Sequence, residues 1–339
     1  SIRLIFGLRE FPSRFGWKSC KIDRFTGFPF VVSVLSSCHA RDYSGIGGSV
    51  LPRCYRFDGS TGMDLRPAAV LEADAARIDE LRRRRDPMAV TTRIRMVDQP
   101  PEGLLPLSLF GRTPLPDRTA LHPRAMETVA PDIAGLYVDY MTRIAMGAPK
   151  RVAFRIPLLG ARLVGQGKYA ESLLSRMVDF AFPSARAACL LLDFDAASRR
   201  GPQYWRPRRM VPDAATYFNL TRMVARSRAF LDEYGPVVWE GFDFEGGYTD
   251  RITSGSGDFL TGDTLWDFKV SGYPPNPRYT LQLLIYWRMG LHSVHPEYQS
   301  IRRLGFFNPR RNEVWLLDVD RITPELIDWT DRELIGYPA

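Results

Sequence analysis

Residues 257–270 read GDFLTGDTLWDFKV, and the fold and the function predicted for this chain both depend on that stretch. Asp267 and Lys269 are two positions apart, so in a β-strand their side chains lie on the same face of the sheet. Trp266 and Phe268 then point to the opposite face. The sequence therefore predicts a strand that has one charged face and one apolar face.

A second carboxylate is expected beside this strand. Asp258 lies in the preceding extended stretch, residues 252–260, and the turn at 261–263 allows an antiparallel pairing that brings Asp258 next to Asp267. Two close carboxylates repel each other unless a cation neutralises them, and a hard divalent cation takes oxygen ligands. We therefore predict a Mg²⁺ site at Asp258 and Asp267, where Mn²⁺ can substitute. Lys269 would lie beside the metal, where it can orient or deprotonate water or offset charge on a reacting phosphate.

The identity of the cation at position 269 supports a chemical role. Only five of the 46 Lys and Arg residues are lysines, so arginine is the usual cation of this chain. An arginine keeps its proton permanently and carries a bulky fork, which would serve poorly next to a metal and a reacting water. The lysine at this position is therefore a candidate catalytic group.

The next predicted helix adds two further candidates. Asn276 and Pro277 are typical of a helix start, and Gln282 and Tyr286 are four positions apart, hence on one face of the helix. The surrounding residues 281–287 are otherwise apolar. A glutamine in such a helix needs hydrogen-bond partners, which the charged strand or a bound nucleic acid would supply.

Hydrophobic patterns along the chain predict an α/β fold and three parts. From residue 213 the predicted order is α-β-β-β-α-β-β-α, over residues 213–234, 237–244, 252–260, 264–270, 277–291, 303–307, 313–318 and 324–336. Several helical patterns within 124–200 predict a mainly helical subdomain, and the proline-rich stretch 88–123 is typical of a linker or a wrapping arm. We therefore divide the chain into 1–87, 88–206 and 207–339.

The first part differs from the rest in its pattern. Residues 1–87 hold most of the cysteines and little sustained periodicity. We interpret them as an N-terminal extension, either a piece of a longer precursor or an upstream addition, and we assign them no role.

Composition and charge exclude several classes of protein. With 339 residues, 45% hydrophobic and 25% charged, the chain is neither disordered, collagen-like nor a coiled coil. Its apolar stretches are shorter than the ~20 residues that a membrane span needs, and its four cysteines form no zinc-binding spacing, so we expect a cytoplasmic protein without a membrane partner. The net charge of +8 suits a polyanionic partner. No GxxxxGK[ST] phosphate loop is present.

Three motifs in order carry a resemblance to a known family. Gly257-Asp258, Asp267-Phe268-Lys269 and the Gln282-to-Tyr286 segment resemble the acidic strand, the DxK strand and the QxxxY helix of the PD-(D/E)XK nucleases, most closely the RecB-like branch. The resemblance covers residues 213–319. It implies a restriction-endonuclease-like αβββαβ core, with Asp258 and Asp267 as metal ligands, Lys269 as the catalytic lysine, and Gln282 and Tyr286 as supporting residues.

The chain departs from the family pattern at one position and leaves another open. Gly257 replaces the proline that precedes the first aspartate, a common variation in this superfamily. A further upstream acid or histidine is expected in many members, and we choose Glu240 as this third metal ligand. The alternatives on the same strand or on helices are Asp243, Glu245, Glu171 and Glu233.

The leading prediction is a metal-dependent nuclease that hydrolyses phosphodiester bonds of nucleic acid, with DNA as the expected substrate. The helical subdomain would grip the substrate or a protein partner. The alternative is a module of the same fold that has lost activity and binds nucleic acid or protein. In the plainest interpretation, Asp267 and Lys269 form only a surface ion pair, worth about 0–1 kcal/mol.

Overall fold

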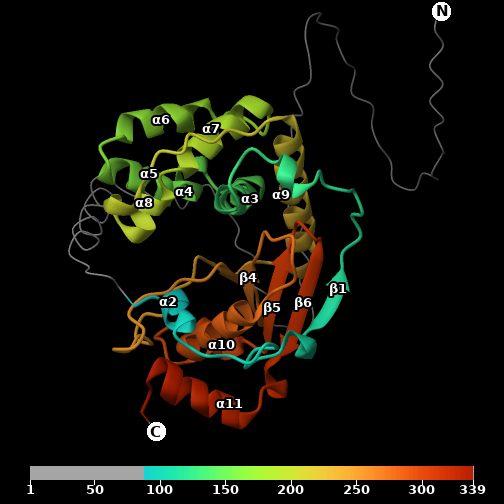
Figure 1. Ribbon diagram of the computed structural model, residues 1–339, viewed down its shortest axis with the longest axis vertical. Coiled ribbons are helices and arrows are strands. Elements are labelled where there is room, and N and C mark those ends of the chain that lie inside the picture. Colours follow the sequence, from blue (N-terminus) through green and yellow to red (C-terminus); the bar gives the residue numbers. More distant parts are fainter. Residues whose placement is uncertain (1–87, 339) are drawn as a thin grey trace, which may run out of the picture. The chain divides into compact units, whose positions relative to one another are not determined.

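The computed structural model describes residues 88–338 of the chain. The predictions made for residues 1–87 therefore lie outside the described residues. Helices and one mixed sheet together form an α/β fold (Figure 1).

The sheet has six strands in the order β1-β6-β5-β4-β3-β2. Their bounds are Gly111–Pro114 (β1), Trp239–Glu240 (β2), Phe259–Leu260 (β3), Thr264–Phe268 (β4), Arg303–Asn308 (β5) and Glu313–Asp318 (β6). All neighbours pair antiparallel except β4 and β5, which run parallel. Parallel neighbours need a crossover connection, and helix α10, Pro277–Leu291, supplies it.

Most helices gather into a subdomain beside the sheet. Its members are α3 (Pro131–Ala145), α4 (Lys150–Ala153), α5 (Arg155–Leu163), α6 (Gly167–Arg176), α7 (Phe182–Leu192) and α8 (Asp195–Arg200). They share one apolar core, to which the long helix α9, Ala214–Tyr234, contributes Leu220 and Met223. Figure 1 shows this group above the sheet, with α9 running from it to the strands. Residues 131–200 are therefore mainly helical.

The two faces of the sheet are covered by different helices. Phe230 of α9 packs with Phe259, Trp266 and Phe307 on one face. The other face buries residues of α10, together with Leu265 of β4, in a second core. Short helices α2 (Val90–Arg95) and α11 (Pro324–Trp329), followed by a π-helical turn at Thr330–Ile335, complete that side.

The structure confirms the predicted helix 277–291 and the predicted strand that carries Trp266. Helix α10 begins at Pro277, and the Asn276 side chain accepts hydrogen bonds from the N–H groups of Arg278 and Tyr279. In β4 the apolar face carries Trp266, which is buried, as predicted. The whole predicted element order from residue 213 is also observed.

Two predictions were wrong: the linker predicted at 88–123, and the length of two predicted strands. The predicted linker 88–123 contains helix α2 and the strand β1, which pairs with β6 and extends the sheet. The predicted strands 237–244 and 252–260 pair over only two residues each, as β2 and β3. Between them, Phe242 and Phe244 lie outside the strands, and they are buried because they pack against Tyr286 and Tyr298.

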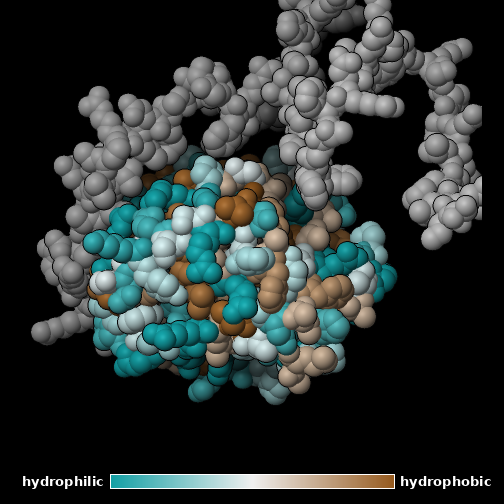
Figure 2. All heavy atoms as spheres, turned by 90° about the horizontal axis from the view of Figure 1, so that it is seen from above, coloured by the Kyte–Doolittle hydropathy of each residue, from teal (hydrophilic) through white to brown (hydrophobic). Residues whose placement is uncertain are grey.

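The described residues contain no candidate membrane span, and their surface mixes apolar and polar side chains. No helix within residues 88–338 is both long and apolar enough to cross a bilayer. Figure 2 shows hydrophobic residues scattered among hydrophilic ones on the face seen from above. Exposed large apolar side chains of the helical subdomain include Val152, Tyr169, Val178 and Phe180. A protein partner at this subdomain stays a prediction.

Candidate active site

The β3–β4 hairpin holds the two carboxylates predicted to bind metal. Phe259 of β3 pairs with Trp266 of β4, which places Asp258 just before β3 and Asp267 within β4. The backbone N–H of Phe268 donates a hydrogen bond of 2.6 Å to Oδ2 of Asp258. The Asp258 carboxylate is therefore fixed against the backbone of the residue that follows Asp267.

The glycine before Asp258 is required by packing. A Cβ atom at Gly257 would lie 1.8 Å from Cζ of the Phe242 ring, and the Gly257 N–H donates to the Phe242 carbonyl at 2.9 Å. A proline here would lose that hydrogen bond and clash with the ring. The departure of Gly257 from the resembled motif thus has a local cause in the buried position of Phe242.

Lys269 lies next to Asp267, on the face that the strand alternation predicts. Its Nζ is 2.7 Å from Oδ2 of Asp267 and 3.5 Å from Oε1 of Gln282. The ring of Tyr279 lies 4.6 Å from the same nitrogen, in a cation–π contact. These groups hold the ammonium at one position beside the carboxylate.

Gln282 and Tyr286 are both buried on α10 and contact each other. Nε2 of Gln282 donates a hydrogen bond of 2.6 Å to the Tyr286 hydroxyl. Gln282 therefore finds its partners in Lys269 and Tyr286, which answers the expectation that a glutamine in an apolar helix must be paired. The structure brings Asp267, Lys269, Gln282 and Tyr286 into one chain of polar contacts.

The electrostatics of the two carboxylates favour a cation. Burial, together with the charges of Asp267 and Asp139, raises the pKa of Asp258 to about 7, although Lys269 and the hydrogen bond from the Phe268 N–H oppose them. Burial also raises the pKa of Asp267, although Lys269 opposes this effect. Burial alone would lower the pKa of Lys269, but the two carboxylates outweigh it and the pKa rises. The site thus combines a charged ammonium with carboxylates that ionise reluctantly.

Glu240, the predicted third ligand, lies on the other face of the sheet. It is exposed and pairs with Phe259, which in turn pairs with Trp266. Residues directly opposite each other in antiparallel strands share a face, so the register puts Glu240 on the α9 side and Asp267 on the α10 side. The structure therefore does not bring Glu240 to the two aspartates.

Two of the alternative acids, Glu171 and Asp243, have other contacts. Glu171 forms an ion pair with Arg151 at 2.6 Å, and Asp243 lies 3.0 Å from His295 Nε2. Asp139 of α3, which we did not predict, is an acid besides Asp267 that interacts electrostatically with Asp258. A detectable signal was its position between the buried residues Val138 and Tyr140, where a carboxylate is unusual.

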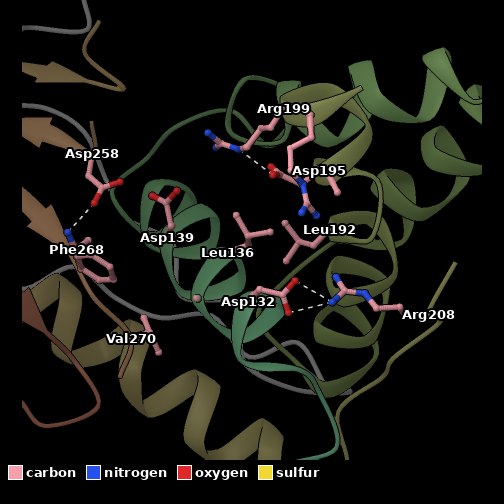
Figure 3. A pocket seen from close by; sticks show the side chains of 13 residues that line it. Asp132, Leu136, Asp139, Leu192, Asp195, Arg199, Arg208, Asp258, Phe268 and Val270 are labelled. Carbon is pink, nitrogen blue, oxygen red and sulfur yellow. Dashed lines mark hydrogen bonds and ion pairs between the residues drawn. The ribbon is translucent and has the colours of Figure 1, made fainter. Parts of the chain in front are cut away.

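Asp139 and Asp258 border a cavity of about 410 Å³ between the sheet and the helical subdomain. Its wall includes Phe268 of the strand and the charged residues Asp132, Asp195, Arg199, Arg200 and Arg208 of the helices and the segment after them. Figure 3 shows Asp258 and Asp139 toward one end and the Asp132–Arg208 ion pair toward the other. The candidate site therefore adjoins a charged cavity that both parts of the fold create.

The donor set fits a magnesium site of two carboxylates. Within residues 88–338, no three His, Cys, Asp or Glu side chains are grouped so that they could hold a metal on their own. Mg²⁺ is often bound by one or two carboxylates, and substrate phosphates and water complete its coordination. Oδ2 of Asp267 is buried and makes no regular hydrogen bond, apart from its ionic contact with Lys269. The magnesium site at Asp258 and Asp267 stays a prediction.

The chain matches no known family model. No curated protein and no solved structure matches it either. The resemblance to the PD-(D/E)XK nucleases therefore depends on the three short motifs around Asp258, Asp267 and Gln282, and it stays a prediction.

Proposed function

We propose that this chain is a Mg²⁺-dependent nuclease of the PD-(D/E)XK type. The observation that carries the proposal is the arrangement of Asp258, Asp267 and Lys269 at one hairpin. The Lys269 ammonium lies 2.7 Å from Asp267, and the Asp258 carboxylate binds the backbone between them. Phosphodiester hydrolysis can use such a set of groups, which here is the buried Asp267, the half-buried Asp258 that lines the cavity, and the Lys269 ammonium.

The topology supports the same proposal. Helix α9 is followed by the antiparallel strands β2, β3 and β4, and α10 then connects β4 to the parallel strand β5. This order equals the αβββαβ order that the resemblance implies. We propose on this ground that residues 213–308 form a restriction-endonuclease-like core.

Each polar residue has a distinct role in the proposed reaction. Hydrolysis forms a bond between the water oxygen and phosphorus, breaks the bond to the leaving ester oxygen, and gives that oxygen a proton. Asp258 and Asp267 would hold Mg²⁺, which when bound polarises a phosphoryl oxygen and lowers the pKa of water. Lys269 orients the attacking water or offsets charge on phosphorus, and Gln282 and Tyr279 keep its ammonium in place.

DNA is the proposed substrate. The chain carries a net charge of +8, and three arginines, Arg199, Arg200 and Arg208, line the cavity next to Asp258. Guanidinium groups bind phosphate oxygens well because their fork matches the phosphate geometry. Arg208 is paired with Asp132 and Asp193, so Arg199 and Arg200 are the proposed phosphate contacts next to the candidate metal site.

The direct test is cleavage of labelled DNA by the purified chain with Mg²⁺, with EDTA, and after substitution. Asp267→Ala and Lys269→Ala should each reduce the rate by at least about 100-fold, because each removes a group that acts on the transition state. Asp263→Ala is the matched control, since Asp263 lies in the turn of the same hairpin and pairs with Arg303 at 2.9 Å, outside the candidate site. It should cleave at the wild-type rate. Equal activity of all three variants would refute the proposal.

One observation favours a second candidate function, a binding module without activity. Lys269 occupies the position next to Asp267, and the described residues include no group of three metal ligands. Titration calorimetry with Mn²⁺ separates the two functions. The nuclease should bind Mn²⁺, and Asp258→Asn should abolish the signal, whereas a binding module need not bind the ion at all.

A further inference from the structure

A buried polar triad connects the helical subdomain to the cavity. The Tyr140 hydroxyl donates a hydrogen bond of 2.6 Å to Oδ2 of Asp195, and Nε of Arg199 donates one of 2.8 Å to Oδ1 of the same carboxylate. Nη2 of Arg199 also donates to the Tyr140 oxygen at 3.2 Å. Tyr140 and Asp195 are buried, while the Arg199 side chain keeps 45% of its surface exposed. Tyr140 and Asp195 thus hold the Arg199 guanidinium from its buried side, while part of the Arg199 side chain stays accessible to solvent.

Arg199 reaches toward the candidate metal site. In Figure 3 its guanidinium extends from α8 toward the end of the cavity where Asp139 and Asp258 lie. Its charge interacts with Asp139. Burial raises the pKa of Tyr286, the carboxylates of Asp267 and Asp258 raise it further, and the Arg199 charge opposes them. Arg199 therefore lines the same cavity as Asp258 and as Phe268 of β4.

The cost of burying Asp195 points to an orienting role. A buried carboxylate loses its hydration, and apolar residues of similar size often stabilise a core equally well. The surrounding core of the helical subdomain is apolar. Within the triad, Nε and Nη2 of Arg199 donate hydrogen bonds, while Nη1 donates to no residue within 88–338. A free donor at a fixed position is what recognition of an anion requires.

We propose that Arg199 is a phosphate-binding residue of the candidate site and that Asp195 and Tyr140 position it. Its guanidinium would donate to a non-bridging oxygen of a nucleic-acid phosphate in the cavity next to Asp258. This inference deepens the proposed nuclease function, on which it depends, because it makes the helical subdomain part of the substrate site. No bond forms or breaks at Arg199.

The test measures binding separately from cleavage. A fluorescent single-stranded DNA oligonucleotide is titrated with the full chain, by anisotropy at several salt concentrations, in an Asp267→Asn background that suppresses the proposed hydrolysis. The test variant combines Arg199→Ala with Asp195→Asn, which removes the guanidinium and leaves no unpaired buried charge. The control combines Arg151→Ala with Glu171→Gln, an exposed ion pair of the same subdomain. Both variants leave the net charge unchanged.

The expected result is a loss specific to the cavity. The Arg199 variant should bind about tenfold more weakly or worse, the equivalent of one charge-assisted hydrogen bond. Its slope of log affinity against log salt should fall by about 0.7, the value for one phosphate contact on a single strand. The Arg151 variant should stay within about twofold of the background chain in affinity, because an exposed pair contributes little. Equal affinities and equal slopes for the two variants would overturn the inference.

Two further outcomes separate this inference from the proposed function. If the double variant does not fold, judged by thermal denaturation, Arg199→Lys replaces it, since lysine keeps the ion pair and lacks the fork. A loss of at least about threefold then supports the inference, and wild-type affinity overturns it. A wild-type chain that binds DNA through Arg199 but never cleaves it would refute only the nuclease. A chain that does not bind DNA would refute both.

Discussion

Asp117 connects three segments that are far apart in the sequence. Its carboxylate accepts hydrogen bonds from the N–H of Thr119 at 2.9 Å, from Arg222 at 2.8 Å and from Nε of Arg226 at 2.9 Å. Arg226 is buried on α9 and also donates to the carbonyl of Pro309 at 3.0 Å. One carboxylate thereby ties the arm before α3 to α9 and, through Arg226, to the loop after β5.

The stability of this junction should depend on pH. Burial opposes ionisation of Asp117, but the hydrogen bonds from Thr119 and from Arg226 and Arg222 outweigh it and lower its pKa. A lowered pKa in the folded state stabilises the fold above the ordinary pKa of about 4, and this contribution is lost as the pH falls further. Asp117→Asn should therefore lower the free energy of unfolding at pH 7 by about 1–2 kcal/mol, and by less at pH 3.

Urea denaturation at pH 7, 5 and 3 measures this difference. Asp328→Asn provides the comparison, because Asp328 pairs with Arg332 on an exposed helix surface, where such pairs contribute about 0–1 kcal/mol. A deficit of Asp117→Asn that stays constant from pH 7 to pH 3 would contradict the expected linkage.

The site residues that were predictable are those with local patterns. The alternation of β4 was sufficient to place Asp267 and Lys269 together, and the spacing of Gln282 and Tyr286 was sufficient to place them on one buried helix face. Tyr279, three positions before Gln282, was recognisable by the same spacing but was missed. The face on which Glu240 lies was not predictable, because it depends on the strand register, which the sequence alone does not fix.

Among the elements, the contact between α5 and α8 controls where Arg199 lies. A Cβ atom at Gly160 of α5 would be 2.0 Å from the carbonyl oxygen of Phe194 and 3.1 Å from the N of Ser198. Both are backbone atoms of α8 or of the residue just before it, and α8 carries Arg199. Backbone atoms cannot rotate away as the end of a flexible side chain would. Glycine is therefore needed for the close approach of the two helices.

Gly160→Ala should push α8 away from α5. We expect a loss of about 1–3 kcal/mol in stability, as for other overpacked sites, together with weaker DNA binding through the displaced Arg199. Gly167→Ala is the control, because its nearest neighbour is Cγ of Arg162 at 3.4 Å. That change should be neutral or stabilising by up to about 1 kcal/mol, since alanine favours helices. Thermal denaturation tests both, and a Gly160→Ala protein as stable as wild type would show that the helices can adjust.

The strands show why the extent of elements was harder to predict than their order. Helices α9 and α10 carry their periodicity and their caps locally, so their bounds follow from the sequence. Phe242 and Phe244 alternate with exposed residues as in a strand, but aromatic partners on other elements bury them instead. Strand β1 has only exposed residues, so no hydrophobic pattern marks it.

At the scale of the whole molecule, the cavity lies where the sheet meets the helical subdomain. Asp258 and Phe268 come from the sheet side, and Asp139, Asp195 and Arg199 come from the helices. Each of the two parts supplies its own apolar core. The cavity could not be predicted from the sequence, because the residues that line it belong to separate local patterns.

The size of the cavity predicts a preference for single strands. Its volume of about 410 Å³ is within the range of small-molecule pockets, about 300–1,000 Å³, so it admits one or a few nucleotides of an extended strand more readily than a rigid duplex. We expect the proposed nuclease to cleave a single-stranded oligonucleotide at least about tenfold faster than the same sequence in a blunt duplex. Parallel cleavage assays with Mg²⁺ test this, and a higher rate on the duplex would contradict it. A duplex with a single-stranded overhang should be cut in the overhang.

Strand β1 has a consequence for how this protein is made. It pairs with β6, and Arg112 of β1 forms an ion pair with Glu313, 201 positions later. During synthesis the arm therefore leaves the ribosome long before its partner exists, and it must stay unpaired while the intervening chain folds. The outermost strand of the sheet is made first and joined last, so an interrupted translation product would carry a bare β-edge and be prone to aggregation.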